Sequence, residues 1–418
     1  MSPSARPAEL NSLWRYGALG FALAFAALPL YIHLPNLYAR EWGVSLSAMG
    51  LALMLTRCAD AWTDILWGPW IDRLWRSGER RFWAGMLTAA AVLFGGMVLL
   101  FFPPEHLLIA ALVVGTTLAT QAHSLLTIAH QSWGLRLGGS VTRRSRIASW
   151  REGFNVLGVV TASALPLLLG WPSWALALAV GLALGLWAWS RGPRPPVAAQ
   201  AGPTPTGRWR RVDGTVRRLL GIQALHALAN AVAAGLVLFF IQDVLQAPEH
   251  QATLLLLYFA AAIASLPLWL RWIARWGLWP AWLAGSALAI VVFLWASRLG
   301  AGEWLAFAVI CVGSGLAIGA DLAVPTAWLA GHLARQQQQQ HSAGTMGWWN
   351  LVNKLALAAS AGLALPLLAG LGYRPGATEP SALQALTLCY AVLPLLLKAT
   401  ALGLMWHWRS TFSTGADT

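Results

Sequence analysis

Long apolar runs separated by short polar segments are the main pattern of this sequence. The runs are about 20 residues long, which is the length an α-helix needs to cross the hydrocarbon core of a bilayer. Their positions predict twelve membrane-spanning helices, over residues 15–37, 46–71, 83–103, 106–133, 146–170, 173–190, 218–244, 251–273, 278–297, 304–331, 344–371 and 383–407. We therefore expect an all-α integral membrane protein with 12 transmembrane helices.

The composition excludes a soluble domain. Of 418 residues, 58% are hydrophobic and only 10% are charged, whereas soluble domains carry about 25% charged residues. The polar N-terminal segment lacks the apolar core and cleavage site of a signal peptide, so the first span is expected to be retained. The three cysteines have neither disulfide nor zinc spacing and fall inside predicted spans, where they are expected to pack as small apolar residues.

The net charge of +13 raises the question of nucleic-acid binding, and the placement of the arginines answers it. Arginines gather in alternate loops, around residues 73–81, 136–146, 191–218, 271–275 and 335. The opposite loops hold only Arg40, Arg298 and Arg374. This positive-inside bias predicts a cell inner (plasma) membrane protein with both termini cytoplasmic, in contact with anionic lipids and with no nucleic-acid partner.

One long polar stretch interrupts the series of spans. Residues 191–217 are rich in Pro, Gly and Arg and cannot be membrane-embedded. They predict a cytoplasmic linker between a six-helix bundle over residues 1–190 and a second six-helix bundle over residues 218–418. Two six-helix halves are the organisation of the major facilitator fold.

Charged residues inside the second span need a physical reason. Arg57, Asp60 and Asp64 are spaced three and four residues apart, so they share one helix face. Each would cost about 2.5–3.5 kcal/mol at the centre of a helix facing lipid, so they must face protein or a wet cavity. Either they staple this helix to a neighbour, or the two carboxylates, with the Thr63 hydroxyl beside them, bind a proton or a hard cation.

The segment that holds these charges carries a family resemblance. Residues 57–83, RCADAWTDILWGPWIDRLWRSGERRFW, resemble the second helix and following loop of the glycoside–pentoside–hexuronide:cation symporters, the melibiose permease family of the major facilitator superfamily. The resemblance places Asp60 and Asp64 on the two cation-site carboxylates, Arg57 on the arginine before them, and Asp72 on the aspartate of the loop. Ile65 departs from the family pattern, which has proline there.

Two further segments are similar to the same family. Residues 140–154, SVTRRSRIASWREGF, resemble its loop four–five and the start of helix five. The resemblance puts Arg144 and Arg151 on two family arginines, the second of which is linked to substrate binding or gating. Residues 344–373 resemble helix eleven, where Lys354 matches a lysine of the cation-site region. A snorkelling lysine near a helix end is the alternative for Lys354.

The first and fourth spans depart from the resemblance. The first has no acid, and the fourth carries His130 and Gln131 where the family has an aspartate. A histidine in a span is either a proton relay or a helix–helix hydrogen bond. Because fewer oxygen ligands are available than in the parent family, protons are favoured over sodium as the coupling ion.

The remaining polar and aromatic groups near these charges are candidates for substrate binding. Asp321 is the acid deepest in the second half, where it either pairs with Lys354 or lies near the kink at Pro325. Tryptophans here either stack on a ligand or belong to the interfacial belts. The full set of substrate-binding candidates is Trp62, His130, Gln131, Trp133, Asp321, Trp348, Trp349 and Asn350.

These features predict a cation-coupled symporter, driven by H⁺ or Na⁺, that moves a sugar-like or glycoside solute by alternating access. The alternatives are a transporter of lysolipid or another amphiphilic anion, and a non-transporting sensor with the facilitator fold. No motif of a nucleophile, metal or phosphate-binding enzyme occurs, so we expect no enzyme activity. No cofactor beyond the coupling ion is expected, and the partners are a small-molecule substrate and membrane lipids, with the chain a monomer.

Overall fold

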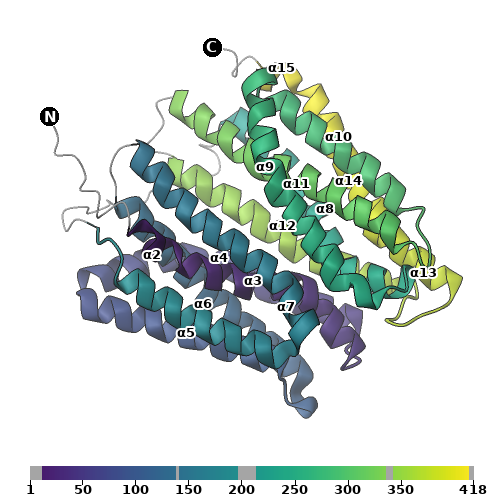
Figure 1. Cartoon of the computed structure of the whole chain (residues 1–418), viewed down its shortest axis with the longest axis horizontal. Coiled ribbons are helices and arrows are strands. Elements are labelled where there is room, and N and C mark those ends of the chain that lie inside the picture. The colour runs from purple at the N-terminus through teal and green to yellow at the C-terminus, as the bar shows by residue number, and fades with distance from the viewer. Residues whose placement is uncertain (1–11, 138–140, 196–212, 336–341, 414–418) are drawn as a thin grey trace. The chain divides into compact units, whose positions relative to one another are not determined.

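The structure is a computed structural model that describes residues 12–137, 141–195, 213–335 and 342–413 (Figure 1). These residues form helices joined by short connections, and they include no β-strand. Ten of the helices in these ranges are long and apolar enough to cross a membrane. The prediction of an all-α membrane protein is confirmed.

The first six predicted spans all fall on helices. They are α2 (Leu13–Gly17) with α3 (Leu19–Arg40), α4 (Leu46–Arg76), α5 (Glu79–Phe101), α6 (Leu108–Arg136) after the short η1 (Glu105–Leu107), and α7 (Val141–Ser190). Helix α4 is 31 residues long, or about 46 Å, which is ample for a span. It is not among the ten apolar helices because its charged residues lower its hydropathy.

Helix α7 carries the fifth and sixth predicted spans together. At Gly170 the backbone leaves the helical region, with φ +78° and ψ 169°, a conformation that only glycine adopts without strain. Pro172 follows directly, and its ring restricts the backbone there. The interruption falls between the two spans that the apolar pattern separates.

The second six predicted spans fall on helices as well. They are α8 (Gly214–Phe239), α9 (Gln251–Trp276) after the short η4 (Pro248–His250), α10 (Leu278–Ala296), α11 (Trp304–Arg335), α12 (Ser342–Gly370), and the run α13 (Pro380–Thr387), η6 (Leu388–Val392) and α14 (Leu393–His407), followed by α15 (Arg409–Ser413). Two of these spans each contain a π-helical turn. The first is η3 (Phe240–Val244) at the end of α8, and the second is η6 before α14. Single π turns inside helices are frequent at functional sites.

The chain divides into two compact units. The first holds Met1–Leu34 and Thr56–Pro203, and the second holds Pro35–Leu55 and Thr204–Thr418. The last residues of α3 and the first residues of α4 are thus counted with the second unit. Most of the predicted linker lies at residues 196–212, outside the described ranges, so the predicted domain boundary stays a prediction.

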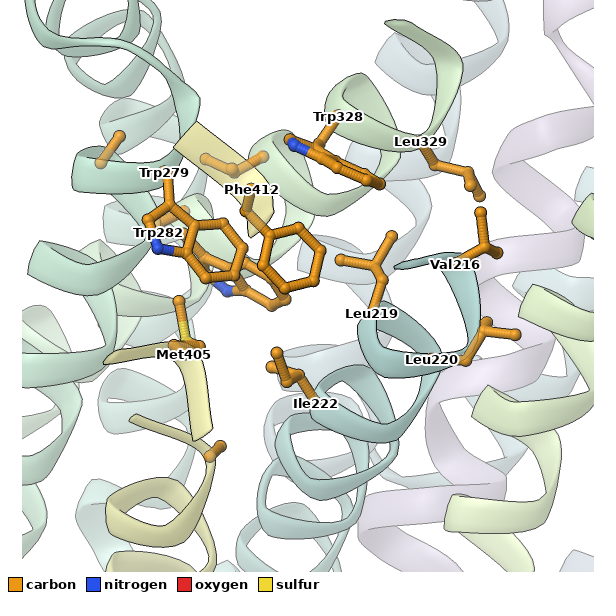
Figure 2. Packing of buried hydrophobic residues seen from close by; sticks show 14 of the residues in the cluster. Val216, Leu219, Leu220, Ile222, Trp279, Trp282, Trp328, Leu329, Met405 and Phe412 are labelled. Atoms are coloured by element: carbon orange, nitrogen blue, oxygen red, sulfur yellow. The ribbon is translucent and has the colours of Figure 1, made fainter. Parts of the chain in front are cut away.

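A core cluster of the second unit, called the tryptophan core below, packs tryptophan rings against aliphatic side chains (Figure 2). The rings of Trp279 and Phe412 stack with centroids 4.2 Å apart, which joins α10 to α15. Trp282 and Trp328 are also fully buried in this cluster. Large rings bury more apolar area than any other side chain, and the buried residues of this cluster come from seven helices, α8 to α12, α14 and α15, which it holds together.

Helices α9 and α11 approach closely because α11 carries glycine at the contact. A Cβ atom at Gly315 would lie 2.3 Å from the carbonyl oxygen of Tyr258, and one at Gly319 would lie 1.9 Å from the hydroxyl of Ser265. Small residues spaced four apart let two membrane helices pack backbone against backbone.

We expect Gly315→Ala to lower the stability of the second unit, by about 1–3 kcal/mol, because the carbonyl of Tyr258 belongs to the α9 backbone and cannot move aside alone. Gly403→Ala in α14 is the matched control, since a Cβ there meets nothing within 4 Å. Thermal unfolding of the purified protein measures both variants. Equal melting temperatures for the two would contradict the close packing of α9 on α11.

Candidate transport site

The charged face of α4 lies inside the first unit. Arg57 and Asp60 are 6% and 7% exposed. The guanidinium of Arg57 donates from Nη2 to the carbonyl oxygen of Leu30 at 2.9 Å and lies 5.0 Å from the ring centroid of Tyr31. Asp60 is within electrostatic range of Arg57. The α3 backbone, the Tyr31 ring and the Asp60 carboxylate thus all stabilise the positive charge.

Helix α6 brings polar side chains to the same face of α4. The hydroxyl of Ser124 donates to Asp60 Oδ1 at 2.9 Å. Thr63 Oγ1 lies 2.7 Å from Gln121 Oε1 and 3.0 Å from the carbonyl oxygen of Asp60, so its one hydrogen serves one of them at a time. Asp64 is half-buried one turn further along α4. Carboxylate, hydroxyl and amide oxygens therefore gather between α4 and α6, which is the chemistry that holds a proton or a hard cation.

The amide oxygen of Gln121 has a second donor. Trp67 donates from Nε1 to Gln121 Oε1 at 3.1 Å. Gln121 is a residue that the sequence interpretation did not select, and it bridges Thr63 and Trp67 from the neighbouring helix. Hydrogen bonds from two side chains of α4 thus engage this amide oxygen of α6.

The predicted charge partners lie in several places. Asp72, near the end of α4, forms an ion pair with Arg136 at the end of α6. Arg151 pairs with its neighbour Glu152 at 2.7 Å within α7. Arg144 lies in the same helix, and its side chain is outside what the structure describes. Lys354 is half-buried on α12.

The substrate candidates on α12 differ in exposure. Trp349 is buried in the tryptophan core of the second unit, Trp348 is half-buried and Asn350 is exposed. Asn353 accepts from Gln223 Nε2 of α8 at 2.9 Å through its Oδ1. Trp349 is therefore positioned to hold α12 in the core, and the amide pair joins α12 to α8.

Asp321 lies at the centre of a buried polar cluster in the second unit. Its Oδ2 accepts from Lys398 Nζ at 2.8 Å and from Asn230 Nδ2 at 3.2 Å. Its Oδ1 accepts from Trp282 Nε1 at 2.9 Å and lies 3.3 Å from His226 Nδ1. The cation that pairs with Asp321 is therefore Lys398, and the expected alternative of pairing with Lys354 is wrong.

The comparisons with known proteins agree with this architecture. The model of the MFS/sugar transport protein family matches residues 13–410, nearly the whole chain. The chain belongs to the MFS/sugar transport protein family. This family member is therefore a multi-pass membrane transport protein, and its fold is the major facilitator fold. A comparison with curated protein sequences finds no significant match.

Solved structures similar to this family member share its fold. A bacterial homolog of the human lysosomal transporter Spinster, in an inward-facing and unoccupied conformation, is 14% identical with a TM-score of 0.71, covering 99% of this chain and 100% of that one. The D323A mutant of the nucleoside transporter NupG is 11% identical with a TM-score of 0.67, covering 94% of this chain and 99% of that one. At such identities the likeness shows the fold alone.

The fourth-span candidates of this family member lie near its aromatic packing. His130 is buried, and its Nε2 lies 2.7 Å from the carbonyl oxygen of Tyr16, whose hydroxyl donates back to the His130 carbonyl at 3.0 Å. Trp133 donates from Nε1 to the carbonyl oxygen of Pro193 at 2.9 Å. These contacts join α2, α6 and the segment that follows α7. Gln131, also on α6, is exposed. The remaining substrate candidate, Trp62 on α4, is 71% exposed.

A second polar group that sequence reasoning missed lies in the π-helical turn at the end of α8. Asp243 forms an ion pair with Arg40 at the end of α3. It also accepts from the hydroxyl of Tyr373 and from the backbone N–H of Gly376 at 3.0 Å. One carboxylate thus ties the end of α3 and the loop between α12 and α13 to α8. The sequence analysis considered Arg40 only as one of the three arginines in the arginine-poor loops, and it did not predict a partner for it.

The phenol of Tyr373 predicts a specific pH dependence. Burial raises its pKa, the hydrogen bond to Asp243 and the charge of Asp243 raise it further, and Arg40 opposes them only in part. The folded pKa of Tyr373 lies above the ordinary value of 10.0. The stability that Tyr373 contributes is therefore fully present below this ordinary value and is lost only as the pH rises through the folded pKa.

We therefore expect Tyr373→Phe to lower the melting temperature by the same amount at about pH 6 and about pH 9, since the phenol is protonated at both. Tyr38→Phe is the matched control, because the Tyr38 hydroxyl is buried and has no hydrogen-bond partner among the described residues. It should change the melting temperature less. A Tyr373→Phe effect that disappears by pH 9 would contradict the assignment.

Proposed function

We propose that this chain is a cation-coupled symporter of a sugar-like or glycoside solute, with both termini in the cytoplasm and a proton as the coupling ion. The family to which the chain belongs supports transport, and the resemblance of residues 57–83 to the melibiose permease family supports the solute class and the coupling. Alternating access then moves the solute as the protein exchanges its two open conformations.

The observation that carries the proposal is the buried carboxylate of Asp60 among the polar groups of α4 and α6. It accepts from Ser124 Oγ at 2.9 Å, close to Thr63 and one helical turn from Asp64. A carboxylate that served only to anchor Arg57 would need no second acid on the same helix face. Two acids on one face can share and release a cation, because binding the cation neutralises charge in a region of low dielectric constant.

A proton fits this set better than sodium does. Sodium needs several oxygen ligands at once, whereas a proton needs a single carboxylate. The amide oxygen of Gln121 already accepts from Trp67 at 3.1 Å and lies 2.7 Å from Thr63 Oγ1. Those oxygens would have to exchange their hydrogen bonds for a metal ion, while protonation of a carboxylate leaves them in place.

Ion flux measured in proteoliposomes tests the proposal. The purified chain is reconstituted with a pH dye inside the vesicles, and monosaccharides, glycosides, nucleosides and lysophosphatidylglycerol are added one at a time. We expect one sugar-like solute to carry protons into the vesicles in the absence of sodium. Solute uptake that is independent of both proton and sodium gradients would refute coupling. A response to lysophosphatidylglycerol alone would refute the solute class.

A further inference from the structure

A second set of ionisable side chains lies buried in the second unit, apart from the acids of α4. His226 comes from α8, Asp321 from α11 and Lys398 from α14, and their side chains are 1%, 6% and 3% exposed. Charged groups buried inside membrane helices are costly and commonly serve transport. The α4 mechanism uses none of these three groups.

The carboxylate of Asp321 is held in its ionised form by its surroundings. Lys398 Nζ at 2.8 Å, Trp282 Nε1 at 2.9 Å and Asn230 Nδ2 at 3.2 Å all donate to it. With Lys398 charged, the pair is neutral overall. A proton that enters this cluster therefore has one natural acceptor, which is the imidazole of His226.

The ring of His226 is placed so that no single protonation state satisfies all its neighbours. Its Nδ1 lies 3.3 Å from an acceptor, Asp321 Oδ1, and 3.4 Å from a donor, Lys398 Nζ. A hydrogen on Nδ1 suits Asp321 and opposes Lys398, whereas a bare Nδ1 suits Lys398 and opposes Asp321. A histidine with a purely structural role usually has one dedicated partner at each nitrogen.

The other ring nitrogen faces a hydroxyl that accommodates either state. Ser286 Oγ lies 3.5 Å from His226 Nε2, and its hydrogen is directed to the carbonyl oxygen of Trp282 at 2.8 Å. In that orientation the Ser286 oxygen presents a lone pair to Nε2 and accepts from a protonated ring. If the hydroxyl rotates, it donates to a neutral ring instead.

Few other titratable groups face this cluster. Helix α9 contributes Tyr258, which is within electrostatic range of Asp321. Helix α10 contributes only Trp282 and Ser286. Helix α12, which packs on α8, carries Lys354. The protonation balance at His226 is therefore set by its burial and by the Lys398 ammonium group, which both disfavour the imidazolium, and by the Asp321 carboxylate, which favours it.

We propose that the cluster of His226, Asp321 and Lys398 is a proton-binding site of the second unit, in which His226 takes up one proton at Nε2 while Nδ1–H donates to Asp321. Uptake of the proton changes the net charge of the cluster from zero to +1. The half-buried Asn230 contacts the cluster by donating to Asp321 Oδ2. The site stands independently of the α4 acids.

The proton itself is the probe, so the test needs no substrate. The full chain is labelled with ¹⁵N-histidine and reconstituted in lipid bilayers, and the ring ¹⁵N signals are followed between about pH 5 and pH 8, the range in which histidine normally titrates. His226→Gln identifies the signal. We expect the His226 ring to convert from neutral to imidazolium within this range as the pH falls.

Single replacements of the two charges give opposite shifts if the site binds a proton. Lys398→Met should increase the imidazolium fraction of His226, with the titration midpoint moving up by about one pH unit, and Asp321→Asn should decrease it. The double variant Lys398→Met/Asp321→Asn removes both charges and keeps the packing, so His226 should titrate close to its wild-type midpoint. This variant replaces the single variants in the test if one of them fails to fold.

Two outcomes would overturn the proposal. If the His226 ring stays in one neutral tautomer between about pH 5 and pH 8, in the wild type and in Lys398→Met alike, the cluster only holds the helices together and binds no proton. A titration that neither charge replacement moves would place the proton elsewhere. Asp60→Asn should leave the His226 signal unchanged, so failure of the α4 cation site and failure of this site are distinguishable.

Discussion

Replacing Asp60 by asparagine is expected to abolish accumulation of the solute against its gradient while leaving exchange of solute across the membrane intact. Asparagine keeps the size of aspartate and its hydrogen bond with Ser124, but it can neither hold a negative charge nor take and release a proton. The carrier then loses the link between ion and solute, although it still moves solute downhill.

The expected loss is large. With one proton per solute, a tenfold proton gradient supports about a tenfold solute gradient, or about 1.4 kcal/mol, and the variant should support none. Uptake and counterflow in proteoliposomes measure the two properties separately. Glu249→Gln is the control, since Glu249 is an exposed acid in η4. Undiminished accumulation by Asp60→Asn would show that coupling does not run through this carboxylate, and Asp64→Asn would then be the next variant to measure.

The second large effect is expected at Lys398. Lys398→Met leaves the carboxylate of Asp321 buried without its cation, and removal of one partner of a buried ion pair costs about 3–5 kcal/mol. Lys398→Met/Asp321→Asn removes both charges, so most of that loss should be recovered. Equilibrium unfolding in detergent compares the single and double variants.

Arg298→Met is the matched control for Lys398→Met, because Arg298 is an exposed cation of a loop. It should leave the stability of the protein almost unchanged. If the double variant is no more stable than Lys398→Met, the two charges do not stabilise each other and the cluster around Asp321 has been misassigned.

The membrane spans were predictable because a single physical requirement produces them. Each crossing needs about 20 apolar residues, and this requirement leaves a mark on the sequence whatever the neighbouring helices are. Even the break in α7 was predictable, since the apolar pattern is interrupted near Gly170 and Pro172. The helices were predicted correctly because the apolar pattern that defines each one lies within its own residues.

The partners of the buried charges were not predictable in the same way. The distance along the chain does not tell which helix faces which, so the sequence could not show that the cation beside Asp321 is Lys398 of α14. Lys398 did carry a signal that was overlooked, because it is a lone cation inside an apolar span. Asp243 and Tyr373 lie near span ends, where polar residues are common, so nothing in the sequence distinguishes them.

The π-helical turn η3 makes the position of Asp243 sensitive to a change in chain length. Such a turn holds one residue more than the α-helical turn it replaces, and each residue of an α-helix rotates the next side chain by about 100°. Deletion of one residue from 240–242 would restore regular winding and turn the aspartate away from Arg40 and Tyr373. Homologous chains one residue shorter at this point would then have to close the same contact with an acid at another position.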